Sequence, residues 1–219
     1  MIINKLNSIE NEIQLKVNEF GILDYKPNII AVSKTFPIKD ILPLINHGHT
    51  HFGENKIQEA LDKWSDIKKN SKELQLHMIG KIQTNKVKYL VELFDYVHSL
   101  DNRKLAEKIS KEQKKKGKYL KIFIQVNIGN ESQKSGISID EVKNFYNICT
   151  QDLKLNIIGL MCLPPNNVKP DFYFNKMKKL KEALPIKQLS MGMSGDYIDA
   201  IKYGSTFVRI GSKIFGERD

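Results

Sequence analysis

Cysteine is scarce in this 219-residue chain, which contains only Cys149 and Cys162. The two lie far apart and match no metal-ligand spacing, so the sequence predicts neither a metal site nor a disulfide framework. No apolar run approaches the roughly 20 residues that span a bilayer. Residues 1–20 carry three glutamates, which is not typical of a signal or transit peptide. We therefore expect a reduced, cytoplasmic protein that has no membrane partner.

Arginine is also rare. The net charge of +10 comes from 35 basic and 25 acidic residues, and only three of the basic residues are arginine: Arg103, Arg209 and Arg218. Proteins that read nucleic-acid bases usually rely on arginine forks and aromatic platforms. The lysines are scattered over segments that we expect to be surface helices, so we expect a solvated surface and no nucleic-acid partner. An RNA-associated function remains a hypothesis that rests on charge alone.

Strand-like and helix-period segments alternate along the whole chain. The strand-like segments are residues 29–33, 51–53, 74–79, 96–99, 120–127, 156–160, 187–190 and 206–210. The helical segments are residues 1–20, 38–46, 55–64, 85–94, 102–116, 139–151, 170–184 and 195–202, so every strand except the last is followed by a helix. This alternation predicts a parallel sheet. Eight units predict an α/β fold, a single (β/α)8 TIM barrel over residues 1–219 that begins with an N-terminal helix. A doubly wound sheet would need a glycine-rich turn after the first strand, and none is present.

One lysine, Lys34, stands directly after the first predicted strand, and the sequence Thr35-Phe36-Pro37 follows it. The C-terminal ends of barrel strands form the active face of this fold. Partial burial there disfavours the ammonium form, and a neutral amine can attack a carbonyl carbon to form a Schiff base. The alternative is a lysine that only extends from a strand end into solvent. His77 and His98, near other predicted strand ends, are expected on the same face.

The loops after the last two strands are suited to binding an anion. Barrels commonly bind phosphate with the loops after strands seven and eight, where Ser194, Gly211 and Ser212 lie. Ser194 directly precedes a predicted helix, so its hydroxyl and the helix amides would point at one anion, or it is simply an N-cap. Arg209 has the planar fork suited to a ligand, or it forms a structural ion pair. An amine opposite a phosphate site predicts a phosphorylated aldehyde, and pyridoxal 5'-phosphate (PLP) is the obvious candidate.

The chain also resembles the pyridoxal phosphate homeostasis proteins, whose barrel is similar to the N-terminal domain of alanine racemase. The resemblance covers nearly the whole chain and is carried by residues 31–34, 51–55, 77–80, Gln83, Asn85, Lys86, 126–127, Glu131, Lys134, Gly136, 159–161, 164–165, 189–194, 204–211, 214–216 and Arg218. It implies PLP as the cofactor and assigns six binding residues: Lys34 for the Schiff base, Ser194, Gly211 and Ser212 for the phosphate, Asn55 for the cofactor wall and Arg209 opposite the pyridine nitrogen.

The resemblance further implies a protein that stores or delivers PLP. Alanine racemase uses a tyrosine from a C-terminal domain as its second base, and this sequence ends soon after the last predicted strand, so we expect no such domain. An arginine opposite the pyridine nitrogen would also weaken the cofactor as an electron sink. We expect a monomer that supplies apo PLP-dependent enzymes. The alternative is a low-activity PLP-dependent racemase that uses His77 or Tyr203 as a local base.

Overall fold

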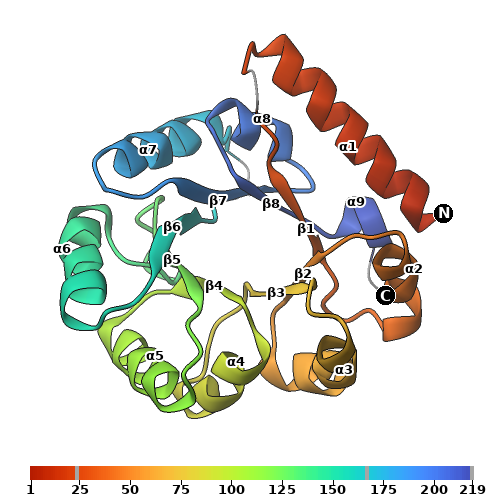
Figure 1. Ribbon diagram of the computed structural model, residues 1–219. Helices are drawn as coiled ribbons and strands as arrows, with labels where there is room; N and C mark the ends of the chain where they lie inside the picture. Colours follow the sequence, from red (N-terminus) through yellow and green to blue (C-terminus); the bar gives the residue numbers. More distant parts are fainter. Residues whose placement is uncertain (23–24, 166–167, 218–219) are drawn as a thin grey trace.

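The computed structural model describes residues 1–22, 25–165 and 168–217, and its centre is a closed barrel of eight parallel strands in the order β1 to β8 (Figure 1). The strands are β1 (Asn28–Val32), β2 (His51–Glu54), β3 (Gln75–Met78), β4 (Tyr96–Leu100), β5 (Lys121–Val126), β6 (Ile157–Cys162), β7 (Gln188–Met193) and β8 (Phe207–Ile210). β1 pairs with β8, which closes the ring. The predicted (β/α)8 TIM barrel is therefore confirmed.

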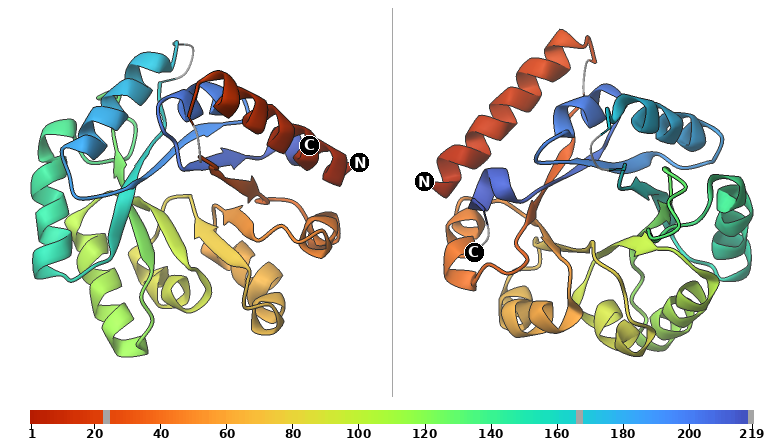
Figure 2. Two further views of the ribbon diagram at one scale, coloured as in Figure 1. Left: turned by 45° about the horizontal axis from the view of Figure 1, so that its top comes forward. Right: turned by 180° about the vertical axis from the view of Figure 1, so that it is seen from behind.

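Helices surround the strands on the outside of the barrel, as Figures 1 and 2 show. They are α1 (Ile2–Glu19), α2 (Ile38–Asn46), α3 (Ile57–Asn70), α4 (Val87–Leu93), α5 (Arg103–Lys116), α6 (Val142–Asn147), α7 (Asp171–Glu182), α8 (Tyr197–Lys202) and α9 (Ser212–Phe215). Within the described residues, no helix combines the length and the apolar character that crossing a membrane requires.

The predicted N-terminal helix is confirmed as α1, which lies along the outside of the barrel beside α2, α8 and α9 (Figure 2). Leu6, Ile9, Ile13 and Val17 are its buried residues. Their spacing of three and four residues places them on one face, and that face covers the barrel.

The last helix, α9, was not predicted from the sequence. The expectation that no helix follows the last strand is wrong, because α9 begins two residues after β8. Four residues are too few for a helical period to be visible in a sequence. The strands predicted at 156–160 and 187–190 also continue to Cys162 and Met193. Arg218 lies outside the described residues, and the prediction of one domain over residues 1–219 stays a prediction.

The barrel interior is filled by a small group of side chains separate from the larger core beneath the helices. This inner cluster consists of Ile30, Tyr96, Phe123, Met161 and Phe207. His77 and His98 lie in the same space: His77 stacks on Tyr96 at 4.2 Å, and His98 stacks on Phe123 at 4.3 Å between ring centroids. The interior is therefore aromatic and carries polar rings.

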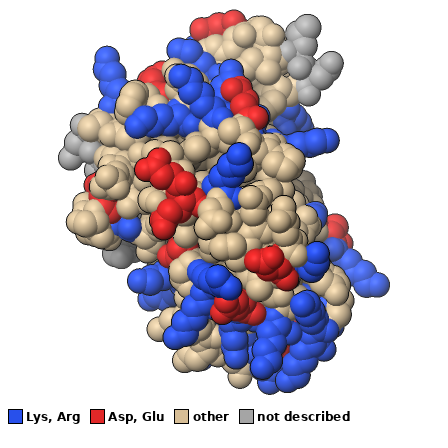
Figure 3. All heavy atoms as spheres, turned by 90° about the vertical axis from the view of Figure 1, so that its left-hand side faces the viewer, with Lys and Arg blue, Asp and Glu red and all other residues tan. Residues whose placement is uncertain are grey.

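Charged side chains of both signs are mixed on the face that α5 and α6 cover, seen in Figure 3. The lysines of α5 alternate along the helix with Glu107 and Glu112. Arg103 pairs with Glu107 at 2.8 Å, and Lys116 reaches Glu92 at 3.1 Å. This interspersed pattern accords with a solvated surface.

Candidate functional site

A cavity of about 620 Å³ opens at the C-terminal ends of the strands, and all six residues singled out in the sequence line it. Its wall also includes several apolar side chains and glycines. The complete lining is Val32, Lys34, Asn55, Ile79, Met161, Leu163, Met193, Ser194, Gly195, Arg209, Gly211, Ser212, Gly216 and Glu217. Among the described residues, no group of His, Cys, Asp and Glu side chains is arranged to hold a metal ion.

Lys34 is presented by a tight turn that follows β1. The backbone N–H of Phe36 donates to the carbonyl oxygen of Ser33 at 3.2 Å, which closes the turn around Lys34 and Thr35. Thr35 has a φ of +69°, in the left-handed region that a β-branched residue rarely adopts. Such strain persists only where the surrounding structure holds it in place.

Glu59 of α3 is one of the groups that hold this turn. Its Oε1 accepts the backbone N–H of Thr35 at 2.5 Å and pairs with Nζ of Lys63 at 3.1 Å. Burial raises the pKa of Glu59, but the bonds from Thr35 and Lys63 outweigh it and lower the pKa below its ordinary value. Glu59 therefore stays ionised at neutral pH and keeps accepting from the turn.

A second carboxylate, Glu54 at the end of β2, is fully buried beneath the same turn. Its Oε1 accepts from the hydroxyl of Ser33 at 2.8 Å, from Nζ of Lys63 at 2.9 Å and from the indole N–H of Trp64 at 2.9 Å. Lys63 also donates to the carbonyl oxygen of Ser33 at 2.8 Å. One buried ion pair and its neighbours thus fix the backbone directly before Lys34.

Asn55 lines the cavity, and the loop that follows β3 passes close to its backbone. A Cβ at Gly80 would lie 2.3 Å from the carbonyl oxygen of Asn55, which no side chain could accept. Glycine at residue 80 therefore allows the two loops to touch.

In space, the side chain of Ser194 lies at the start of α9, although α8 is the next helix along the sequence. Its Oγ accepts the backbone N–H of Gly211 at 3.2 Å and that of Lys213 at 3.5 Å. The N-cap position of α8 is instead held by Asp196, whose carboxylate accepts the N–H of Met193 at 2.6 Å. The expectation that Ser194 begins the helix after β7 is therefore wrong.

The path of the chain into Ser194 depends on Gly192. This residue has a φ of +90°, and a Cβ added there would lie 2.6 Å from the Cβ of Ala200. Only glycine combines that backbone conformation with that approach to α8. Gly192 thus directs the end of β7 toward the cavity.

Arg209 of β8 is 5% exposed and extends from the barrel interior to the cavity. Its Nη1 donates to Oγ of Ser190 at 2.6 Å, and its Nη2 donates to the carbonyl oxygen of Cys162 at 2.9 Å. Burial lowers its pKa from the ordinary value. No carboxylate of the described residues forms a salt bridge with it. Within those residues, the alternative of a structural ion pair is wrong.

The two residues considered as catalytic bases do not line the cavity. His77 is fully buried inside the barrel, where it contacts His51 and His98, and not on the open face as expected. The hydroxyl of Tyr203 donates to Asp171 at 3.0 Å on the outside of the barrel. Sequence reasoning missed the link between the histidines. The available signal was an inward-facing histidine on three consecutive strands.

Comparisons with known proteins support one family. The family model described as alanine racemase, N-terminal domain, matches residues 10–219. The pyridoxal phosphate homeostasis protein of Aquifex aeolicus is 35% identical over 98% of this chain and 97% of its own length. The protein of the same name from Escherichia coli is 33% identical over 100% of this chain and 97% of its own.

Solved structures share the fold of this chain. PipY of Synechococcus elongatus, solved with PLP bound, is 29% identical with a TM-score of 0.83 and covers 99% of this chain and 100% of its own. Alanine racemase of Clostridium difficile is 12% identical with a TM-score of 0.69, and the match covers 95% of this chain and 57% of the racemase. That second likeness shows the fold alone.

Proposed function

The chain belongs to the family of pyridoxal phosphate homeostasis proteins, and we propose that it binds PLP in the cavity of about 620 Å³ and holds it for delivery. The observation that carries this proposal is the chemistry of the cavity lining. Residues that carry an amine, a guanidinium, hydroxyls and backbone N–H groups line one space, from elements far apart in the sequence. PipY, the relative solved with PLP bound, supports the choice of ligand.

The donor set suits both ends of a phosphorylated pyridine aldehyde. The hydroxyls of Ser194 and Ser212 and the backbone around Gly211 supply neutral donors for a phosphate group. These groups lie together where α9 begins, because Ser194 already contacts the Gly211 amide at 3.2 Å. Asn55 contributes to the wall from the β2 side of the cavity.

Lys34 is the proposed covalent anchor. In its neutral form, Nζ adds to the aldehyde carbon and a water molecule leaves, so that a C=N bond replaces the C=O bond. Lys34 is half-buried at a strand end and lines the cavity. The hydrogen-bonded turn from Ser33 to Phe36 fixes the backbone from which the Lys34 side chain extends.

Arg209 is proposed to face the pyridine nitrogen and to favour retention over turnover. PLP supplies an electrophilic aldehyde and, when its ring is protonated, an electron sink. A guanidinium donates hydrogen bonds and accepts none, so beside the ring nitrogen it disfavours protonation there. This arrangement suits a carrier, since binding is retained while the electron sink is weakened.

We extend the proposal to the protein's setting: a monomer of one domain in the cytoplasm that passes PLP to apo PLP-dependent enzymes. The alternative function, a low-activity racemase, draws on the shared fold. It is disfavoured because neither His77 nor Tyr203, the two bases considered for it, lines the cavity.

The central test is spectroscopic. The protein incubated with PLP is expected to absorb visible light as a Schiff base, and borohydride is expected to abolish that band and leave a modified lysine that peptide mass spectrometry maps to Lys34. Lys34→Ala should lose both signals. Lys56→Ala is the matched control, since Lys56 is exposed and adjoins Asn55. A Lys34→Ala variant with an unchanged spectrum would refute the anchor.

A second assay separates carrier from enzyme. The loaded protein is mixed with an apo PLP-dependent enzyme, and recovery of that enzyme's activity is compared with alanine racemisation by the loaded protein alone. Transfer without racemisation supports the proposal. Robust racemisation that disappears in Lys34→Ala would establish the alternative.

A further inference from the structure

A chain of hydrogen bonds runs through the barrel interior and ends at Arg209. His51 Nδ1 lies 2.9 Å from His77 Nε2, and His77 Nδ1 lies 2.9 Å from His98 Nε2. His98 Nδ1 lies 2.8 Å from Oγ of Ser190, which accepts from Nη1 of Arg209 at 2.6 Å. Consecutive polar contacts therefore join side chains of β2, β3, β4 and β7 to Arg209, the residue opposite the proposed cofactor.

The direction of every bond in the chain follows from Arg209. A guanidinium can only donate, so Oγ of Ser190 accepts from it; the other contact of Oγ among the described side chains is Nδ1 of His98, which we take as the acceptor of the hydroxyl hydrogen. Nδ1 of His98 must then carry a lone pair, and its proton lies on Nε2. The same reasoning applies in turn to His77 and His51, so all three rings are Nε2–H tautomers.

This orientation stabilises a buried charge that no described carboxylate pairs with. Each ring presents its lone pair toward Arg209 and its N–H away from it, so the dipoles are aligned with the guanidinium field. Stacking of His77 on Tyr96 and of His98 on Phe123 keeps the rings from turning. The chain thus acts as an ordered substitute for the water that would solvate a cation.

This arrangement requires neutral imidazole rings, and the surroundings of the rings lower their pKa values. Burial, and then the charge of Arg209, lower the pKa of His98 well below its ordinary value. The pKa of His51 is lowered to about 4, chiefly by burial; the charges of His49 and Lys121 act in the same direction, and Asp95 opposes them.

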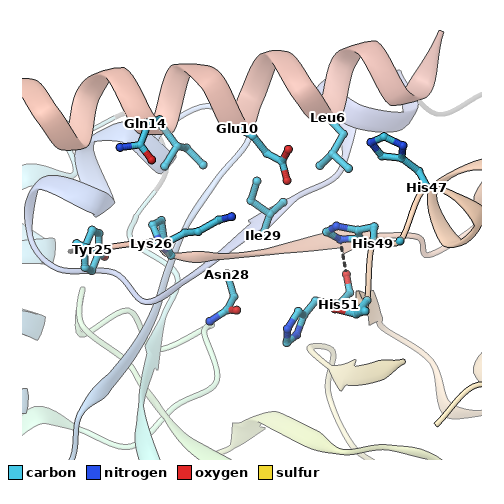
Figure 4. Close-up of a pocket in the computed structure, with 14 residues that line it drawn as sticks. Leu6, Glu10, Gln14, Tyr25, Lys26, Asn28, Ile29, His47, His49 and His51 are labelled. Carbon is cyan, nitrogen blue, oxygen red and sulfur yellow. Dashed lines mark hydrogen bonds between the residues drawn. The ribbon is translucent and has the colours of Figure 1, made fainter. Parts of the chain in front are cut away.

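The two ends of this series of hydrogen-bonded side chains line different cavities. Arg209 faces the cavity of about 620 Å³ at the C-terminal ends of the strands. His51 lines another, of about 440 Å³, at the opposite ends of the strands beneath α1. Figure 4 shows the His51 ring beside Asn28, on the side of β1 away from α1.

We propose that Ser190, His98, His77 and His51 are positioning residues for Arg209, holding its inner edge so that its outer edge meets the cofactor's ring nitrogen. This inference rests on the proposed function for its ligand, while the chain itself is a property of the protein without PLP. Ser190 and His98 have the largest effect, because they are nearest to the guanidinium.

The first test needs neither a variant nor the cofactor. Long-range proton–nitrogen NMR spectra of the protein, prepared without PLP and labelled with ¹⁵N-histidine, report the tautomer of each ring. At pH 7 we expect His51, His77 and His98 to be neutral with the proton on Nε2. A proton on Nδ1 of His98, or a charged ring at that position, overturns the inference.

The second test measures PLP affinity by absorbance titration. Ser190→Ala removes a hydrogen bond to a charged group and should weaken binding about tenfold. The NMR spectrum of this variant should also no longer show His98 as the Nε2–H tautomer alone. Ser190→Thr, which keeps the hydroxyl, should restore both signals. Ile30→Val is the packing control, because Ile30 belongs to the same inner cluster but is not a member of the hydrogen-bonded chain.

The outcomes distinguish the two proposals. If Ser190→Ala binds PLP as tightly as the unaltered protein, the positioning role is refuted. If the unaltered protein does not bind PLP at all, the proposed function fails, while the tautomer measurement still decides whether the chain exists.

Discussion

The hydroxyl of Ser33 lies 2.8 Å from Oε1 of Glu54, and this contact joins the residue before Lys34 to a carboxylate with no exposure to solvent. The same oxygen accepts from Lys63, so a buried ion pair lies directly beneath the strained turn at Thr35. The position of the proposed anchor therefore depends on residues that never meet the ligand.

The first prediction concerns this ion pair. Lys63→Met leaves Glu54 buried without its cation, and breaking a buried pair in this way costs about 3 kcal/mol of unfolding free energy. Urea denaturation measures it. Lys69→Met is the matched control, because Lys69 pairs with Asp66 at 2.8 Å on the open surface. Equal losses in the two variants would contradict the role assigned to burial.

The second prediction tests the turn that carries Ser194. Gly192→Ala forces a side chain into a backbone with φ of +90° and against Ala200, so it should lower the unfolding free energy by about 1–3 kcal/mol. Gly195 lies three residues further on, after the end of β7, where an added Cβ has nothing within 4 Å, so Gly195→Ala should change stability little. The prediction fails if denaturation midpoints of the two variants coincide.

The third prediction separates phosphate recognition from binding of the ring. Ser194→Ala removes one hydroxyl donor and should weaken PLP binding about tenfold. Binding of pyridoxal, which has no phosphate, should be almost unchanged. Titrating PLP and pyridoxal into the unaltered protein and into Ser194→Ala gives the loss of affinity for each ligand. An equal loss of affinity for the two ligands would contradict a role for Ser194 in phosphate binding.

The fourth prediction concerns pH. Burial lowers the pKa of His77 and His98 well below 6.5, so between pH 6.5 and their folded values the unfolded chain binds more protons. Stability should be full above pH 6.5 and fall as the pH drops, by up to about 1.4 kcal/mol per pH unit for each neutral ring. Denaturation at a series of pH values measures the slope.

The control for this slope is already in the barrel. His98→Phe removes one titrating ring and should make the slope shallower, whereas Phe123→Leu should lower stability by the same amount at every pH. If the unfolding free energies of the unaltered protein and of His98→Phe change with pH in parallel, His98 does not contribute to the pH dependence.

Much of the fold followed from the sequence because the signals are local. Alternation of strand and helix periods is visible within short windows, and the helix at 38–46 has the predicted bounds. Lys34 and Arg209 were found because a strand end and its next few residues define the open face of a barrel, whereas Asn55 was implied by the family resemblance. Their roles toward PLP stay predictions.

What the sequence did not reveal depends on which strands are neighbours and in what register. Ser194 meets Gly211 only because β7 and β8 pair with a shift between Ser190 and Met193. His51, His77 and His98 form a chain only because the strands are staggered around the ring. Neither set of contacts can be predicted from the residues of a single sequence segment.

The pairing of β1 with β8 has a consequence for how the protein matures. Lys34 follows the first strand of the barrel, while Arg209, Gly211 and Ser212 come with its last strand, so the cavity exists only once the ring is closed. A partly synthesised chain cannot sequester a reactive aldehyde. A ligand that joins both sides of this seam would in turn hold it shut and slow the opening of the barrel.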